Sequence, residues 1–198
     1  MTDQLHILQV NAEEDLKLSA NKSTISPLRQ QVVQTEEQRY QLLPQQDKSL
    51  PPLSSVQGIG SLSHQSEDFE RELNMALRLT PIFRGIKENL QEVTWIYYLS
   101  AQAFISLYPR NTEFAFEQSV LELPFFTQGL PENNPQRQTS WTEAYLDLAG
   151  QGMMVTANAP IYYNDQFRGT VAMDITLDRL DQAIQNFDYA QGTLFILG

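Results

Sequence analysis

A stretch near the C-terminal end of the chain, residues 131–178, brings together side chains that could bind a small molecule. Aromatic rings would exclude water, a guanidinium group would hold a carboxylate, and carboxylates would hold an ammonium group or hydroxyls. The strand-like run 167–175 also contains one acid among apolar neighbours. With one tyrosine from the earlier strand-like run 94–99, the candidate site residues are Arg137, Trp141, Tyr145, Asp147, Asp174 and Tyr98.

Most of these side chains also have a purely structural interpretation. Trp141 fits a core or lid position, and Asp147 could cap the turn around Gly150 and Gly152. Asp174 is the most informative, because a carboxylate inside an apolar strand is costly unless a partner stabilises it. Strand alternation nevertheless allows it to face solvent, or to cap a helix that begins near Thr176.

Composition excludes several classes of function. The 24 acidic and 13 basic side chains give a net charge of −11, which disfavours binding to nucleic acid or to an anionic membrane surface. The chain has no cysteine, and its two histidines, His6 and His64, precede the expected core, which disfavours thiolate or histidine metal sites and a Ser-His-Asp enzyme. We therefore expect no metal, no cofactor and no catalytic residue. An enzyme that uses paired carboxylates ranks far behind.

The elements that precede residue 67 look like an appendage. Of 20 aromatic residues only Tyr40 lies before residue 69, so we expect the core in the C-terminal two thirds and a helical stalk and linker in residues 1–66. One apolar stripe predicts a first helix that either packs on a partner helix or is solvated: Leu5, Leu8, Ala12 and Leu16. A second helical stretch is expected from Ser26-Pro27, with Leu28, Val32, Tyr40 and Leu43 on its apolar side, and a linker over residues 44–66.

Residues 67–187 predict an α+β domain with helices on one side of an antiparallel sheet. Ser66 should cap one helix, and Thr80-Pro81 should begin another behind a threonine cap. A closing helix is expected over Leu177–Phe187. The expected strands are Thr94–Leu99, Ala103–Tyr108, Met153–Tyr163 and Phe167–Ile175.

The order of motifs in residues 141–177 resembles a known family. The pattern reads W-T-x-x-Y-x-D, A-G-x-G, P-I-Y and then F-x-G-x-x-A-x-D-I-T-L, and over residues 67–198 the chain resembles the Cache, or PDC, sensor domains of bacterial transmembrane receptors. The resemblance implies a long N-terminal helix and a PAS-like sheet with a ligand pocket. It also implies that residues 188–198, with a strand from Thr193, begin a truncated membrane-proximal lobe.

The resemblance further implies an extracytoplasmic, periplasmic sensing domain that relays ligand binding to a cytoplasmic kinase or cyclase. Trp141, Tyr145 and Asp147 would lie on the pocket-lining segment, with Asp174 on the closing strand. Leu123 replaces the arginine that holds the carboxylate in amino-acid-binding members, and Arg137 is a candidate substitute. The expected partners are a small-molecule carboxylate or amine and a second copy of the chain through the N-terminal helix. Membrane contact would come only from segments absent from this sequence. The alternative is a dimerisation or partner-binding module without a ligand.

Overall fold

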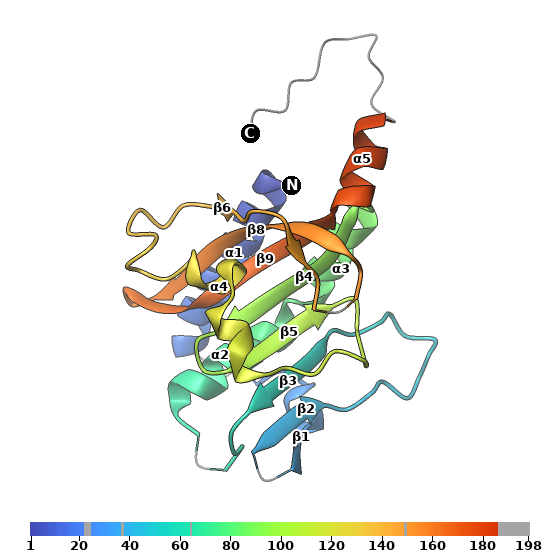
Figure 1. The fold of residues 1–198 in the computed structure, drawn as a ribbon. Coiled ribbons are helices and arrows are strands. Elements are labelled where there is room, and N and C mark those ends of the chain that lie inside the picture. The colour runs from blue at the N-terminus through green and yellow to red at the C-terminus, as the bar shows by residue number, and fades with distance from the viewer. Residues whose placement is uncertain (22–24, 37, 64, 149, 186–198) are drawn as a thin grey trace.

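A computed structural model of the chain describes residues 1–21, 25–36, 38–63, 65–148 and 150–185. Within these residues the strands form one antiparallel sheet (Figure 1). The strands are β1 (Val32–Glu36), β2 (Arg39–Leu42), β3 (Ser55–Ile59), β4 (Val93–Ser100), β5 (Phe104–Tyr108), β6 (Ser140–Trp141), β7 (Tyr145–Leu146), β8 (Met153–Tyr163) and β9 (Gln166–Thr176). The spatial order is β1-β2-β3-β5-β4-β9-β8-β6, and β7 also pairs with β8. The sheet therefore places β4 and β9 side by side at its centre.

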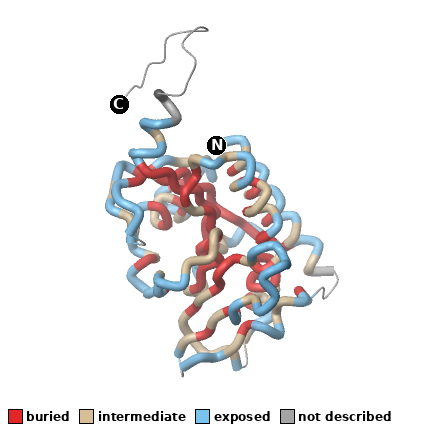
Figure 2. Tube along the Cα trace, turned by 90° about the vertical axis from the view of Figure 1, so that its right-hand side faces the viewer, coloured by how far each residue is buried: buried red, intermediate tan, exposed pale blue. Residues whose placement is uncertain are grey.

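Helices cover both faces of this sheet. On one face pack α1 (Thr2–Asn21), α2 (Glu67–Arg78) and α3 (Thr80–Asn89), which share a core cluster with Ile96 and Tyr98. The other face carries a second cluster, in which Tyr97 and Leu99 contact the segment that holds the 3-10 helix η2 (Gln118–Glu122) and α4 (Pro124–Thr127). Figure 2 shows the buried residues concentrated in the sheet and on the inward sides of the helices. Consecutive residues of β4 thus point into two different clusters, as strand alternation requires.

The α+β prediction and the four central strands are confirmed. Ser66 caps α2 as expected, because its hydroxyl accepts a hydrogen bond from the Phe69 backbone N–H at 3.1 Å. The predicted threonine cap of α3 is wrong, since Leu79 holds the cap position and the Thr80 hydroxyl instead bonds that of Ser54 at 2.9 Å. The placement of all helices on one side is also wrong, because α4 and η2 lie on the opposite face.

The expectation that residues 1–66 lie outside the core is wrong. The apolar stripe of α1 is almost completely buried within this chain, so it is not open to a partner helix. The predicted second helix is instead the 3-10 turn η1 (Arg29–Gln31) followed by β1 and β2, and the predicted linker contains β3. Tyr40 and Val56 are each 1% exposed, because β2 and β3 extend the sheet from β5 and bury these side chains against residues distant in sequence.

The chain leaves the sheet through α5 (Leu177–Gln185), which projects beyond the end of β9 in Figure 1. The Thr176 hydroxyl accepts a hydrogen bond from the Arg179 backbone N–H at 3.3 Å and so caps this helix. Phe187 and the predicted second lobe in residues 188–198 lie outside the described residues. No helix in the described ranges is both long enough and apolar enough to cross a membrane.

Candidate ligand-binding pocket

A cavity of about 40 Å³ lies between the central strands, the η2–α4 segment and β7. This is room for about three water molecules. Its lining residues are Trp95, Tyr97, Ile105, Leu107, Phe114, Val120, Phe125, Tyr145, Asp147, Leu148 and Asp174. The walls are mainly aliphatic and aromatic, and the Phe125 ring packs against Tyr97 and Tyr145 at centroid distances of 5.8 and 5.6 Å. The cavity is therefore a small apolar space that carries a few polar groups.

Asp174 is the more deeply buried of the two acids that line the cavity. Strand pairing sets it between Trp95 of β4 and Thr156 of β8, and only 4% of its surface is exposed. The Thr156 hydroxyl donates to Asp174 Oδ1 at 2.6 Å, and the Tyr97 hydroxyl donates to the same oxygen at 3.2 Å. Among the described residues Oδ2 has no hydrogen-bond partner. One oxygen of a buried carboxylate is thus available to a ligand.

A short chain of hydroxyls extends from Asp174 to the edge of the cavity. Tyr145 Oη and Thr156 Oγ1 lie 2.6 Å apart. Because Thr156 has one hydroxyl proton and donates it to Asp174, Tyr145 must be the donor to Thr156. The chain Tyr145–Thr156–Asp174 therefore orients its protons toward the carboxylate, as suits an ionised Asp174.

Burial raises the pKa of Asp174 to about 7, and the nearby charge of Asp147 acts in the same direction. The hydrogen bonds from Thr156 and Tyr97 lower that pKa, but by less than burial raises it. A carboxylate with this pKa is close to half-protonated at neutral pH. A cation in the cavity would hold it in the ionised form.

Asp147 performs the capping role considered from the sequence and also lines the cavity. Its Oδ2 accepts hydrogen bonds from the Gln151 backbone N–H at 2.9 Å and from Trp95 Nε1 at 3.3 Å. Its own backbone N–H donates to the Gly152 carbonyl at 2.9 Å, which closes the turn. The second carboxylate of the cavity is thus fixed by the turn that follows β7.

The structure brings Tyr145, Asp147 and Asp174 together but places the other three candidates elsewhere. Tyr98 points to the opposite face of the sheet, where its hydroxyl lies 2.7 Å from Glu72 Oε1. The Arg137 guanidinium lies 3.8 Å from the ring centroid of Tyr162 and 3.1 Å from Asp165.

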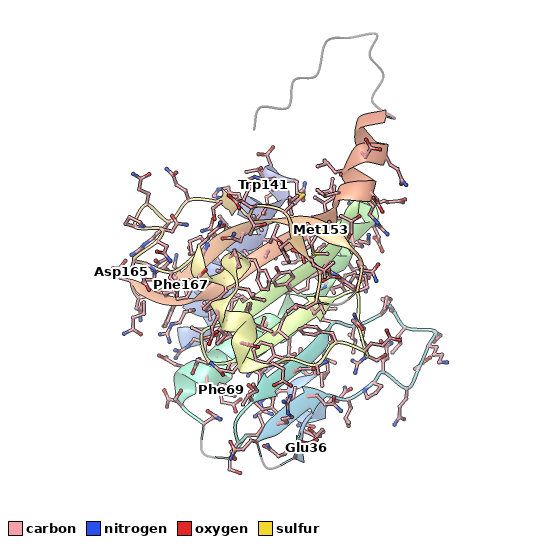
Figure 3. All side chains as sticks on the ribbon, in the orientation of Figure 1. Glu36, Phe69, Trp141, Met153, Asp165 and Phe167 are labelled. Atoms are coloured by element: carbon pink, nitrogen blue, oxygen red, sulfur yellow. The ribbon has the colours of Figure 1, made fainter. Side chains whose placement is uncertain are left out.

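Trp141 is 47% exposed on the short edge strand β6 (Figure 3), which excludes a core position. The prediction that all six residues share one site is therefore wrong for Tyr98, Arg137 and Trp141.

Sequence reasoning missed Trp95, Tyr97 and Phe125. Alternation within the predicted strand Thr94–Leu99 separates Trp95 and Tyr97 from Tyr98, so the choice of Tyr98 selected the wrong face. The pairing of Asp174 with Trp95 decides between the two faces, and it becomes visible only once β4 and β9 are adjacent. No sequence signal marks Phe125 as a wall of this cavity.

Comparisons with known proteins identify a family and several similar solved structures. Residues 66–182 match the family described as methyl-accepting chemotaxis protein-like, first PDC sensor domain. Similar solved structures include the ligand-binding domain of the Pseudomonas aeruginosa PAO1 amino acid chemoreceptor PctC in complex with GABA, at 23% identity over 65% of this chain and 55% of that one, with a TM-score of 0.43.

The ligand-binding domain of the Campylobacter jejuni chemoreceptor Tlp3 in complex with L-norvaline matches at 14% identity over 93% and 60%, with a TM-score of 0.48. That of the Pseudomonas fluorescens chemoreceptor CtaA in complex with L-valine matches at 19% over 50% and 43%, with a TM-score of 0.40. The chain covers less than two thirds of each of these structures. Because the family match covers more than half of the sequence, this protein belongs to the methyl-accepting chemotaxis protein-like first PDC sensor domains.

Proposed function

We propose that this chain is the extracytoplasmic sensing domain of a bacterial transmembrane receptor, and that its cavity binds the ammonium group of a small molecule at Asp174. As a PDC sensor domain it is a binding module and not an enzyme. The receptor would lie in the inner membrane, with this domain in the periplasm and a kinase, cyclase or chemotaxis output in the cytoplasm. The observation that carries the proposal is the buried Asp174 carboxylate, which lines the cavity and whose Oδ2 has no hydrogen-bond partner among the described residues.

Charge favours an amine over a carboxylate as the recognised group. Two carboxylates, Asp147 and Asp174, line the cavity, and none of its lining residues is basic. A bound carboxylate would meet like charges without a counter-ion, which costs free energy beside a buried carboxylate. Arg137, the candidate carboxylate partner from the sequence, is engaged by Asp165 and Tyr162 instead.

Size limits what enters without rearrangement. A volume of about 40 Å³ accommodates an ammonium group and a short carbon chain, well below the roughly 300 Å³ of a typical small-molecule pocket. A longer ligand requires Phe125 or Leu148 to move outward. Such a displacement of the wall would supply the signal, since a ligand shifts an equilibrium only through its differential affinity for the two states.

A thermal-shift and calorimetric comparison tests the proposal. The ligands are isobutylamine, isobutyrate and isobutanol, which share one carbon skeleton, require the same outward movement of the wall and differ in charge. We expect the amine alone to stabilise the protein, by about 2.7 kcal/mol at a hundred times its dissociation constant. Asp174→Asn should abolish this effect. The control Asp178→Asn, which removes one exposed acid of α5, should retain it.

Equal responses to all three ligands, or an amine response that survives Asp174→Asn, would contradict the proposed site. Stabilisation by isobutyrate alone would contradict the assignment of the charge.

Dimerisation remains the second candidate, and a specific surface favours it. The outer side of α1 exposes Ile7 by 48%, Val10 by 38% and Leu18 by 71%, and their spacing of 3 and 8 residues keeps them close to one side of the helix. A homodimer through α1 would use this side, because the inner stripe is buried. Light scattering of the wild type and Leu18→Gln measures it. A dimer lost in Leu18→Gln, together with a flat ligand screen, would favour the dimerisation module over the sensor.

A further inference from the structure

A second and larger concavity lies in a part of the chain that the sensing proposal does not use. The loop between β2 and β3, residues 43–54, projects at the lower right of Figure 1. Together with residues of η1 and α3 it encloses a groove of about 600 Å³. This volume lies within the range of about 300–1,000 Å³ that is usual for small-molecule sites.

The loop that forms the groove is held in place by hydrogen bonds from Arg110 and within the loop. The Arg110 guanidinium donates to the carbonyl of Leu42 at 3.0 Å and to that of Ser54 at 3.4 Å, and so ties the two ends of the loop together. Within the loop, Asp47 Oδ1 accepts from the backbone N–H and the hydroxyl of Ser49 at 2.9 and 2.6 Å. The groove is therefore a preformed surface.

The walls of the groove combine apolar side chains with three glutamines, Asp47 and Arg84. Leu28, Leu43, Leu50 and Leu53 line it together with two prolines of the loop. Leu43 and Leu50 are 41% and 56% exposed, so part of this apolar surface remains in contact with solvent. A ligand with a hydrocarbon body would remove that surface from water at a gain of about 25 cal/mol per Å².

One cation, Arg84 of α3, lines the groove. Its closest carboxylate is Glu88, whose Oε1 lies 3.9 Å from Arg84 Nε on a side chain that is 69% exposed, which is a weak ion pair. The acid on the groove wall, Asp47, has one oxygen engaged by Ser49. Arg110, at the base of the loop, adds a second positive charge and donates to carbonyls. The two arginines are offset by Asp47 and Glu88, so this region is close to neutral in a chain of net charge −11, and Arg84 is the cation among its lining residues.

From the apolar side chains of the walls and the position of Arg84 we propose that this groove is a second binding site, for an amphipathic monocarboxylate whose hydrocarbon body lies against the leucines. Its carboxylate accepts hydrogen bonds from the Arg84 guanidinium, which is better suited to a planar carboxylate than an ammonium group is. The site differs from the Asp174 cavity in both charge preference and size. It stands whether or not that cavity binds an amine.

Isothermal titration of the 198-residue chain with octanoate, octylamine and octanol tests the site. We expect saturable octanoate binding at one site per chain, about tenfold tighter than that of octanol, as a charge-assisted hydrogen bond would give. Arg84→Gln should remove this tenfold preference. Leu50→Ala, at a half-exposed position with little cost to folding, should weaken octanoate about threefold. The control Lys48→Gln removes a positive charge from the same loop without touching the groove wall, and it should change nothing.

Three results would overturn the proposal. One is octanoate binding that does not saturate, and another is binding that Lys48→Gln weakens as much as Arg84→Gln does. The third is octanoate binding that Asp174→Asn abolishes while Arg84→Gln retains it, which would place the anion in the other cavity. If isobutylamine fails to stabilise the protein but octanoate binding is unchanged in Asp174→Asn, the second site is supported and the proposed amine sensing is contradicted.

Discussion

Replacing Asp174 by asparagine should stabilise the protein in neutral and alkaline solution and change its stability little at pH 4. Burial raises the pKa of this carboxyl to about 7, from 3.8 in an unfolded chain. Below pH 4 both states hold the proton. Between pH 4 and 7 the unfolded chain releases it and the folded chain keeps it, so the free energy of unfolding falls as pH rises, and it levels off above pH 7. The two pKa values correspond to a total cost of about 4 kcal/mol.

Asparagine keeps an oxygen that can accept from Thr156 and Tyr97 but cannot ionise, so it avoids this cost. Urea denaturation of the wild type and Asp174→Asn at pH 4, 5, 6, 7 and 8 measures the effect, and the difference between the two proteins cancels the carboxyls they share. We expect the variant to gain stability progressively over the wild type, reaching about 2–4 kcal/mol at pH 8. A difference independent of pH, or a variant less stable than the wild type at pH 8, would refute the reasoning that burial dominates at Asp174.

Three further outcomes follow from the same structure. The dissociation constant for isobutylamine should fall about tenfold per pH unit between pH 5 and 7 and stay constant above 7, because the amine binds the ionised Asp174; calorimetry that gives one value across this range would contradict this. Gly169→Ala should lower the free energy of unfolding by at least about 2 kcal/mol, and the melting temperature with it. The reason is that a Cβ at this position would clash with the Leu99 carbonyl oxygen, and that the backbone φ of +153° is unfavourable for any residue with a side chain. Gly85→Ala, with nothing within 4 Å, is its matched control, and equal melting temperatures of the two variants would count against the argument. Tyr40→Phe should keep or raise the midpoint of urea unfolding, because the buried Tyr40 hydroxyl has no hydrogen-bond partner among the described residues, and a loss above about 1 kcal/mol would show a missing contact.

Local sequence signals were sufficient for the central strands and for α2. Alternating apolar residues bounded by turn residues mark β8 and β9, and Ser66 followed by three acids marks the start of α2. The same kind of reasoning failed over residues 26–59. Leu28 and Val32 have helical spacing, but only the 3-10 turn η1 lies between them, and β1 and β2 follow because Tyr40 and Val56 are buried by partners far along the chain. A local pattern cannot report such partners.

The candidate site could be predicted only in part. Asp174 was singled out because a carboxylate in an apolar strand needs a partner, and its burial agrees with that reasoning. Arg137 was selected for its charge, yet its guanidinium packs over the ring of Tyr162 and pairs with Asp165. A surface guanidinium can be stabilised by such a cation–π contact and ion pair without any ligand. Which face of β4 meets Asp174 depends on strand order, and strand order is a property of the assembled sheet.

Strand β4 holds a buried acid on each side of the sheet through two consecutive tyrosines. The Tyr97 hydroxyl bonds Asp174 at 3.2 Å in the cavity, and the next residue, Tyr98, bonds Glu72 of α2 at 2.7 Å on the opposite face. A rigid slide of this strand changes both hydrogen bonds at once. The hydrogen bond between Tyr98 and Glu72 therefore reports on the cavity from the opposite face of the sheet.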